Sequence, residues 1–182
     1  MDGVRAYWNG EQLISRQGKV ISCLEDVKWF ERLPTNVELD GELWMGHGTT
    51  HENIIKVLNT KSGDWSQIGY YIFDVPSNRG TYEDRIAEMK ALKSTLPLQV
   101  HVVENIRCSG EEHLMEYLDS VVAAEGEGVI LRKPNTTYEA GYTTSILKVK
   151  VVQAIISSEN QKFEDTEVKV VAVVEGGLLC QQ

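Results

Sequence analysis

Two pairs of side chains in this 182-residue chain have the types and spacing that suit phosphate chemistry. Lys148 and Lys150 stand two residues apart on a predicted strand, so both amines point to the same side of it. Glu42 and Glu127 each adjoin a glycine at the end of a predicted strand, where a side chain can face a cleft. Positioned cations stabilise the charge that builds on a phosphate during group transfer, and Mg²⁺ is typically held by few carboxylates plus phosphate oxygens and water.

Each pair also has a plainer interpretation, as solvated lysines on a strand face and as acidic residues of surface turns. What favours chemistry is that six short segments follow one another in one order. They are Asp2–Arg5, Ser15–Gly18, Leu39–Glu42, Tyr71–Asp74, Glu127–Pro134 and Leu147–Lys150. This series resembles the ATP-dependent DNA ligases, especially the small ligases of viruses and some bacteria, and it spans nearly the whole chain.

The resemblance implies roles for the charged pairs and the cofactors that they serve. Lys148 and Lys150 are expected to act in catalysis by holding the α-phosphate of ATP as pyrophosphate leaves. Glu42 and Glu127 are expected to bind the nucleotide ribose and a divalent metal ion, Mg²⁺. The family reaction carries AMP on a lysine, moves it to the 5′-phosphate of a nick and seals the nick in double-stranded DNA.

The resemblance also implies five further binding residues. Phe73 is expected to stack on adenine, with Val129 on the opposite face, and Arg5 to contact the ribose or the nick. Arg16 and Arg132 are expected to bind the nick phosphate, because a guanidinium makes two parallel hydrogen bonds to a phosphate. The alternatives are a core position for Phe73 and solvated positions for the arginines.

The first segment departs from the family at one decisive residue. The family motif is Lys-x-Asp-Gly-x-Arg, and the sequence begins at the residue before Asp2. The nucleophilic lysine would precede Met1, so we expect a chain truncated at both ends that does not carry out ordinary ATP-dependent ligation. Two alternatives stay open. The chain could be a non-catalytic ligase fragment that binds adenylate or a partner, or an RNA ligase or capping-type nucleotidyltransferase.

The sequence predicts an α+β fold in three parts. Residues 1–150 are expected to form a nucleotidyltransferase (adenylation) domain of mixed, largely antiparallel sheets with flanking helices, lacking its first residues. Residues 151–161 are expected to form a linker or insert, and residues 162–182 the first strand of a truncated OB-fold domain. Gly141–Thr143 stands where the family has Gly-Arg-Ser, which removes one phosphate-binding cation.

Hydrophobic periodicity and turn residues predict the individual elements. Asn9-Gly10 predicts a two-residue hairpin, and Tyr70 to Phe73 form a continuous apolar run that predicts a strand buried on both faces. The expected strands are 4–8, 12–15, 37–45, 68–75, 99–104, 128–131, 146–149 and 167–174. The expected helices are 26–33, 51–58, 82–94 and 111–124.

The composition of the chain bears on its binding partners and on its cellular compartment. The formal net charge of -9 weakens the expectation that this chain alone grips nicked DNA, although a local groove can be basic on an acidic body. No window reaches the length of a membrane span, and we expect a monomer. The three cysteines are widely spaced and form no metal-ligand pair, which favours a reducing intracellular compartment.

Overall fold

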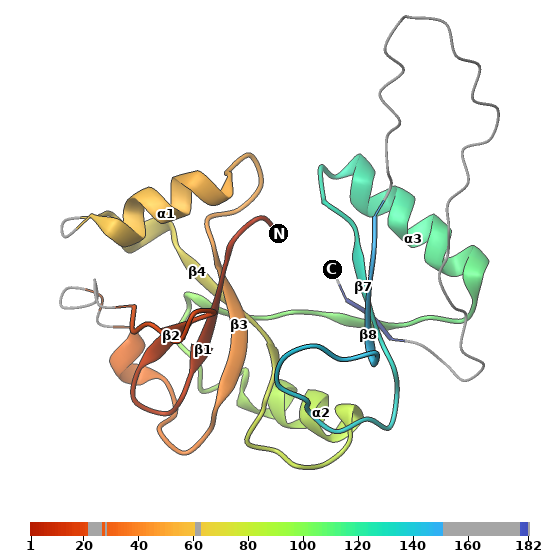
Figure 1. Cartoon of the computed structure of the whole chain (residues 1–182), viewed down its shortest axis with the longest axis horizontal. Coiled ribbons are helices and arrows are strands. Elements are labelled where there is room, and N and C mark those ends of the chain that lie inside the picture. The colour runs from red at the N-terminus through yellow and green to blue at the C-terminus, as the bar shows by residue number, and fades with distance from the viewer. Residues whose placement is uncertain (22–26, 28, 61–62, 151–178, 182) are drawn as a thin grey trace, which may run out of the picture.

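Two β-sheets, each covered by its own helices, make up the described part of the chain (Figure 1). The structure is a computed structural model that describes residues 1–21, 27, 29–60, 63–150 and 179–181. The first sheet has the strand order β2-β1-β3-β4-β5, and the second has the order β6-β9-β7-β8. Only the β4–β5 pair among the named strands is parallel, so the predicted α+β class with largely antiparallel sheets is confirmed.

The elements have the following bounds. The strands of the first sheet are β1 (Val4–Trp8), β2 (Leu13–Ser15), β3 (Leu39–Trp44), β4 (Gly69–Asp74) and β5 (Val100–Val102). The strands of the second sheet are β6 (Asn105–Arg107), β7 (Val129–Arg132), β8 (Ile146–Val149) and β9 (Leu179–Gln181). The helices are α1 (His51–Asn59), α2 (Tyr82–Leu92) and α3 (Glu111–Ala123), with short 3-10 turns at Phe30–Arg32 and Trp65–Gln67.

Each sheet has its own hydrophobic core. Ile54 and Leu58 of α1 and Met89 of α2 are buried with the apolar residues of the first sheet. Leu114 and Leu118 of α3 are buried with residues of β7 in a separate cluster under the second sheet. Because the two cores do not merge, the space between the sheets is left to the polar and charged side chains of their facing strands.

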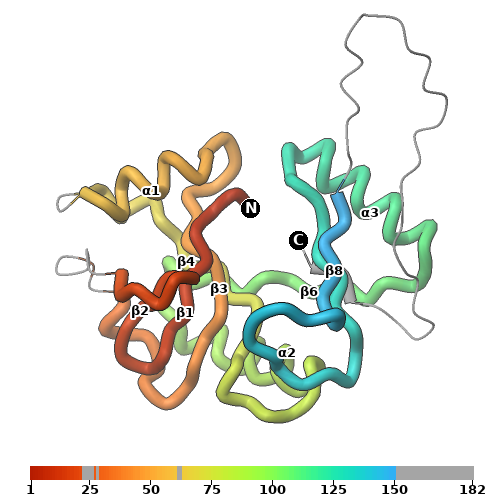
Figure 2. Tube along the Cα trace, in the orientation of Figure 1, coloured from red at the N-terminus to blue at the C-terminus, as the bar shows by residue number. Residues whose placement is uncertain are grey.

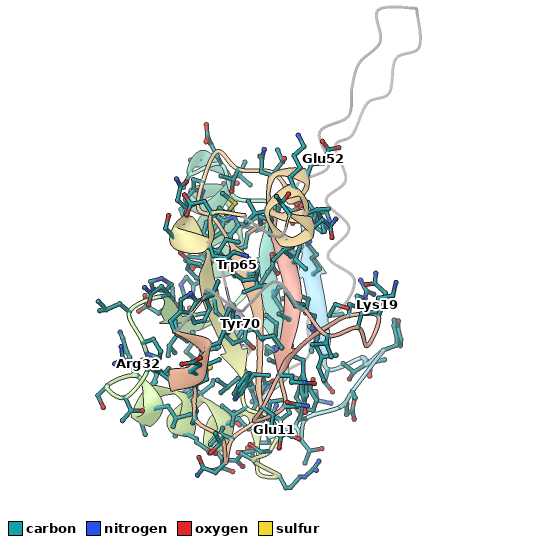
Figure 3. The ribbon with its side chains drawn as sticks, turned by 90° about the vertical axis from the view of Figure 1, so that its left-hand side faces the viewer. Glu11, Lys19, Arg32, Glu52, Trp65 and Tyr70 are labelled. Atoms are coloured by element: carbon teal, nitrogen blue, oxygen red, sulfur yellow. The ribbon has the colours of Figure 1, made fainter. Side chains whose placement is uncertain are left out.

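Tyr70 and Gly41 fix the centre of the first sheet. The Tyr70 side chain is fully buried, and its hydroxyl donates to the carbonyls of Ala6 and Leu39, both at 3.0 Å. A Cβ at Gly41 would lie 2.7 Å from the Tyr70 ring and 2.6 Å from the carbonyl oxygen of Tyr71. Glycine is therefore required where the ring crosses β3. Figure 3 shows Tyr70 inside the molecule, whereas Glu11 lies at its edge.

Two of the three α-helices begin at a capping box. Thr81 and Asp84 form a reciprocal capping box at the start of α2, and Thr50 and Asn53 form one at the start of α1. The predicted helices 51–58, 82–94 and 111–124 are confirmed within two residues at each end. Of the predicted helix 26–33, the structure describes a 3-10 turn that ends before Pro34.

Three sequence-based predictions about strands were wrong. The first turn is a four-residue loop, because the Asn9 side chain accepts hydrogen bonds from the backbone amides of Glu11 and Gln12 at 2.9 and 2.7 Å. Strand β4 is buried on one face only, since Tyr71 and Phe73 are half-buried. The segment 99–104 contains only β5, and the following strand β6 was not predicted because its residues Asn105–Arg107 are polar.

The segment after residue 150 is described only at β9. This strand lies between β6 and β7 and is antiparallel to both, so it belongs to the second sheet. The predicted linker 151–161 and the predicted strand 167–174 lie outside the described residues.

The loop 133–145 between β7 and β8 reaches across to the first sheet and α2 (Figure 2). The backbone amide of Asn135 donates to the Glu83 carboxylate at 3.0 Å, and the Tyr138 hydroxyl donates to Asp40 at 3.0 Å. The loop therefore joins the two halves of the structure at one end. Within the described residues, no helix is both long and apolar enough to cross a bilayer.

Candidate active site

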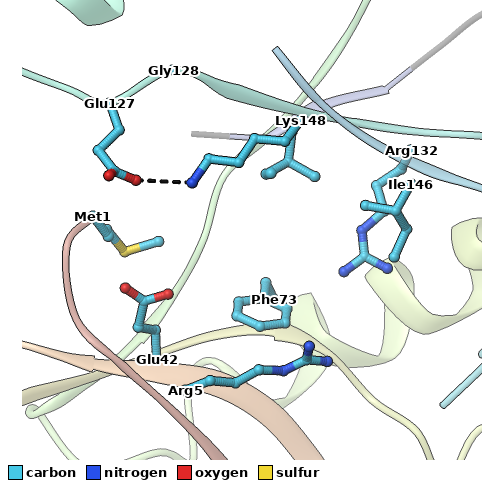
Figure 4. A pocket seen from close by; sticks show the side chains of 10 residues that line it. Met1, Arg5, Glu42, Phe73, Glu127, Gly128, Arg132, Ile146 and Lys148 are labelled. Carbon is cyan, nitrogen blue, oxygen red and sulfur yellow. Dashed lines mark hydrogen bonds and ion pairs between the residues drawn. The ribbon is translucent and has the colours of Figure 1, made fainter. Parts of the chain in front are cut away.

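Charged side chains from both sheets converge on one cavity of about 240 Å³ (Figure 4). The first sheet supplies residues of β1, β3 and β4, and the second supplies residues of β7, β8 and the turn before β7. The lining consists of Met1, Arg5, Glu42, Phe73, Glu127, Gly128, Ile130, Arg132, Ile146 and Lys148. Segments that lie far apart in the sequence therefore meet at one place.

Glu127 is held between two lysines on one side of the cavity. Lys148 donates to one carboxylate oxygen at 2.9 Å, and Lys150 donates to the other at 3.4 Å. The hydrogen bond from Lys148 lowers the pKa of Glu127. Partial burial opposes the charged form of Lys148, but the contact with Glu127 raises the pKa of this amine above its ordinary value. The predicted convergence of the two amines is thus present, and in this structure they converge on a carboxylate.

Glu42 faces Glu127 from the first sheet. Its carboxylate accepts a hydrogen bond from the backbone amide of Gly3 at 2.6 Å. A Cβ at Gly3 would lie 2.3 Å from the backbone carbonyl oxygen of Leu43 and 2.7 Å from this carboxylate, so glycine is required there. Burial raises the pKa of Glu42, and the Gly3 hydrogen bond opposes that shift. Figure 4 shows the Met1 side chain between the two glutamates.

Asp2 of the first segment has a role beside the cavity rather than in it. Its carboxylate accepts a hydrogen bond from the backbone amide of His51 at 3.0 Å, at the start of α1. A negative charge at a helix N-terminus is favourable, because the first amides of a helix lack partners within it. The His51 ring is also 2.8 Å from the Gly3 carbonyl oxygen. The Asp-Gly pair therefore ties the beginning of β1 to α1.

Two guanidinium groups lie near the Phe73 ring. The Arg5 and Arg132 guanidiniums lie 5.8 and 5.9 Å from the centre of its ring. Arg5 makes two hydrogen bonds to the buried Asp40, at 2.5 and 3.0 Å, and this contact raises the pKa of the guanidinium. Tyr138 donates to the same carboxylate, and its own pKa is raised, mainly by burial.

Arg132 is fixed by a second buried carboxylate. Its Nη1 donates to Asp74 at 2.9 Å, while Nε has no hydrogen-bond partner among the residues that the structure describes. Arg85 of α2 donates to the same carboxylate through Nε at 2.6 Å. The guanidiniums of Arg85 and Arg132 carry two positive charges and the Asp74 carboxylate carries one negative charge, so this buried cluster next to Phe73 has a net charge of +1.

The structure brings most of the sequence-predicted residues together. Six of them line the cavity, and Lys150 reaches it through Glu127. Arg16 lies in a wider adjoining hollow of about 560 Å³ that shares Glu42, Glu127 and Lys148 with the cavity. Val129 is placed elsewhere: it is fully buried in the core beneath α3.

Strand alternation explains the position of Val129 and identifies residues that the sequence did not. Successive side chains of a strand point to opposite faces, so Ile130, not Val129, faces the cavity. Arg85, Tyr138 and Ile146 were also missed. For Arg85 a signal existed, since it lies on the same helical face as Tyr82, Ile86 and Met89, where an arginine must have a buried partner.

The donor groups fit a nucleotide with a divalent cation. Phe73 and Ile130 offer two apolar surfaces for a base, and Lys148 offers a cation for phosphates. Two carboxylates that face one cavity suit Mg²⁺, which takes its remaining ligands from phosphate oxygens and water. Within residues 1–150, leaving out the gaps given above, no group of three or more His, Cys, Asp or Glu side chains forms a complete metal cage.

Comparison with known proteins identifies the family of this chain. The family model for the ATP-dependent DNA ligase domain matches residues 1–150. This chain belongs to the ATP-dependent DNA ligase family. The DNA ligase of Haemophilus influenzae is 35% identical over 155 residues, which cover 84% of this ligase-family chain and 56% of that protein. A DNA ligase of African swine fever virus is 28% identical over 143 residues, which cover 71% of the chain and 33% of the viral protein.

Solved structures of DNA ligases have the same fold. A structure from a study of DNA binding by the minimal Lig E ligases superposes with a TM-score of 0.72 at 28% identity, covering 82% of this ligase-family chain and 59% of the other. Chlorella virus DNA ligase-adenylate superposes with a TM-score of 0.69 at 25% identity, covering 83% and 59%. The chain thus spans little more than half the length of the Haemophilus relative and of these two structures.

Proposed function

We propose that these residues form the nucleotide-binding and AMP-transferring core of an ATP-dependent DNA ligase that acts on nicked double-stranded DNA. One observation supports this most strongly: side chains from five separate sequence segments face a single cavity. Each of them has the chemical type that its place in adenylyl transfer requires. Residues 151–161 remain proposed as a linker, and the proposal of the beginning of an OB-fold domain is kept only for residues 162–178, because β9 pairs with β6 and β7 in the second sheet.

The cavity suggests where each part of the nucleotide lies. The base inserts between Phe73 of the first sheet and Ile130 of the second, beside Ile146, because these apolar side chains line the cavity from the two sheets. The ribose lies toward Glu42 and Arg5, and the phosphates lie toward Lys148. Ile130 takes the role that sequence reasoning gave to Val129.

The two charged ends of the cavity suggest the remaining roles. Glu42 and Glu127 hold Mg²⁺ together with the phosphates, and Lys148 and Lys150 turn from Glu127 toward the α-phosphate when the nucleotide binds. These ion pairs are half-exposed, so little free energy opposes their exchange for phosphate contacts. Arg16, in the adjoining hollow, is placed to meet the 5′-phosphate of a nick.

Arg132 has a different place from the one that sequence reasoning gave it. It is 8% exposed and its guanidinium is bound to Asp74. Its geometry therefore favours a role in the cavity wall beside Phe73 over direct contact with a nick phosphate. RNA ligases and capping-type nucleotidyltransferases share the first motif, but no contact among the described residues favours their chemistry over DNA ligation.

Sealing of a pre-adenylated nick tests the proposed function. This last step of the family reaction uses no lysine nucleophile, since AMP is already on the DNA and the 3′-hydroxyl displaces it. We expect a polypeptide of residues 1–182 to seal such a nick slowly with Mg²⁺, and to seal an ordinary nick with ATP not at all. A gel assay with 5′-labelled DNA measures both.

The test variant is Lys148→Met, because Lys148 lines the cavity. The matched control is Lys90→Met, because Lys90 is exposed on α2. Sealing should be lost in the first and kept in the second. If no product forms from the pre-adenylated nick, the proposed transfer function of these residues is wrong, and a role in binding adenylate without turnover is favoured.

A further inference from the structure

A buried arginine outside the cavity holds one of its walls. Arg85 is 2% exposed and is absent from the cavity lining described above. Its Nε donates to Asp74 at 2.6 Å, and its Nη1 donates to the carbonyl oxygens of Gly80 and Thr136 at 3.1 and 2.9 Å. One guanidinium therefore connects the end of β4, the start of α2 and the loop 133–145.

The Asp74 carboxylate carries this connection to the second sheet. Asp74 directly follows Phe73 in β4, and its second oxygen accepts a hydrogen bond from Arg132 at 2.9 Å. Arg132 stands two residues after Ile130 in β7, on the same face of that strand. The chain Arg85–Asp74–Arg132 thus joins the two walls just behind the side chains that would enclose a base.

Charge counting shows that Arg85 is not needed to neutralise this cluster. Asp74 and Arg132 would form a one-to-one ion pair without it. Arg85 adds a second guanidinium to the same buried carboxylate, which an ion pair built only for stability does not require. Its extra contacts go to the backbone of Gly80 and Thr136, so its distinct contribution is geometric.

We propose that Arg85 is a positioning residue that sets the gap between Phe73 and Ile130, and thereby the affinity of the site for a nucleobase. This inference rests on the proposed function, because it assigns the gap to the base of the bound nucleotide. Arg85 itself contacts neither base nor phosphate. Its replacement should weaken recognition of the base and leave recognition of the phosphates at Lys148 unchanged.

Two probes separate these effects: ATP, which has a base, and inorganic tripolyphosphate, which has none. Equilibrium binding with Mg²⁺ is measured for the wild-type polypeptide and for Arg85→Met, Arg85→Lys and Lys90→Met. In Arg85→Met we expect the Kd for ATP to rise about tenfold, because the loss of one base–aromatic stacking contact weakens binding by about that factor. The Kd for tripolyphosphate should not change. Arg85→Lys should lie in between, since a lysine can pair with Asp74 but lacks the planar fork. The exposed Lys90→Met should match wild type for both probes.

The outcomes distinguish this inference from the proposed function. Equal weakening of both probes in Arg85→Met, or wild-type affinity for ATP, would overturn the positioning role alone. If the wild-type polypeptide binds tripolyphosphate and no ATP, the proposed nucleotide site fails and the inference falls with it. Far-UV circular dichroism shows whether each variant folds. If Arg85→Met does not fold, the affinities of Arg85→Lys for ATP and for tripolyphosphate test the positioning role instead.

Discussion

A polypeptide extended by Met-Lys before Met1 is expected to acquire the mass of one AMP when it is incubated with ATP and Mg²⁺. Met1 lines the cavity together with Glu42, Glu127 and Lys148. The Cα atom of a residue added before Met1 would lie about 3.8 Å from the Met1 Cα atom. We therefore expect a long side chain at that preceding position to reach the same cavity. The nitrogen of a lysine there would form the bond to the α-phosphorus, and the bond to pyrophosphate would break.

The expected effect is large because a nucleophile is added. Removal of a nucleophile in a well-studied enzyme costs about 10⁶ in rate, so a change from no adduct to a substantial fraction is expected here. The control is a Met-Arg extension, which supplies the same charge without a nucleophilic amine. A second control combines the lysine with Lys148→Met. Intact-protein mass spectrometry measures the AMP adduct. An adduct on the polypeptide with the arginine extension, or no adduct on either extended polypeptide, would contradict the proposed arrangement.

Asp74→Asn is expected to destabilise the fold strongly. The Asp74 side chain is fully buried and is the shared partner of Arg85 and Arg132. An amide would leave two buried guanidiniums without a counter-charge, and breaking such a buried ion pair costs about 3–5 kcal/mol. Urea unfolding followed by circular dichroism measures the loss.

The matched control for this substitution is Asp119→Asn on the exposed face of α3. Surface substitutions of this kind change the free energy of unfolding by about 0.5 kcal/mol or less. A loss in Asp74→Asn no larger than that of Asp119→Asn would mean that the buried cluster does not stabilise the structure.

The parts of the fold that the sequence predicted well have strong local signals. Strand β1 follows from an apolar run that ends at a turn signal, and helices α1, α2 and α3 follow from apolar residues at helical spacing. Strand β6 was missed because a short polar strand has no such signal. The early turn was given the wrong length because Asn9 favours two turn geometries, and its side-chain hydrogen bonds select the longer one.

The site residues, too, could be predicted only where the sequence carries a local signal. Glu42, Glu127, Lys148 and Phe73 could be picked out because a motif order marks them, and the structure brings all four to one cavity. The face on which Val129 lies could not be chosen without the register of β7 against β8. Sequence position alone also did not show that Arg132 and Arg85 share one carboxylate, because these residues lie 47 positions apart and meet only through Asp74.

The cavity between the sheets is expected to hold one nucleotide, and binding of ATP to the wild-type polypeptide measures this. Equilibrium dialysis with ATP and Mg²⁺ should show saturable binding at one site. Phe73→Ala should weaken that binding by about tenfold or more through loss of stacking on the base. Leu98→Ala, at a side chain that is 92% exposed and far from the motif segments in sequence, should not change it. Absence of saturable binding, or equal affinity in wild type and Phe73→Ala, would contradict the account.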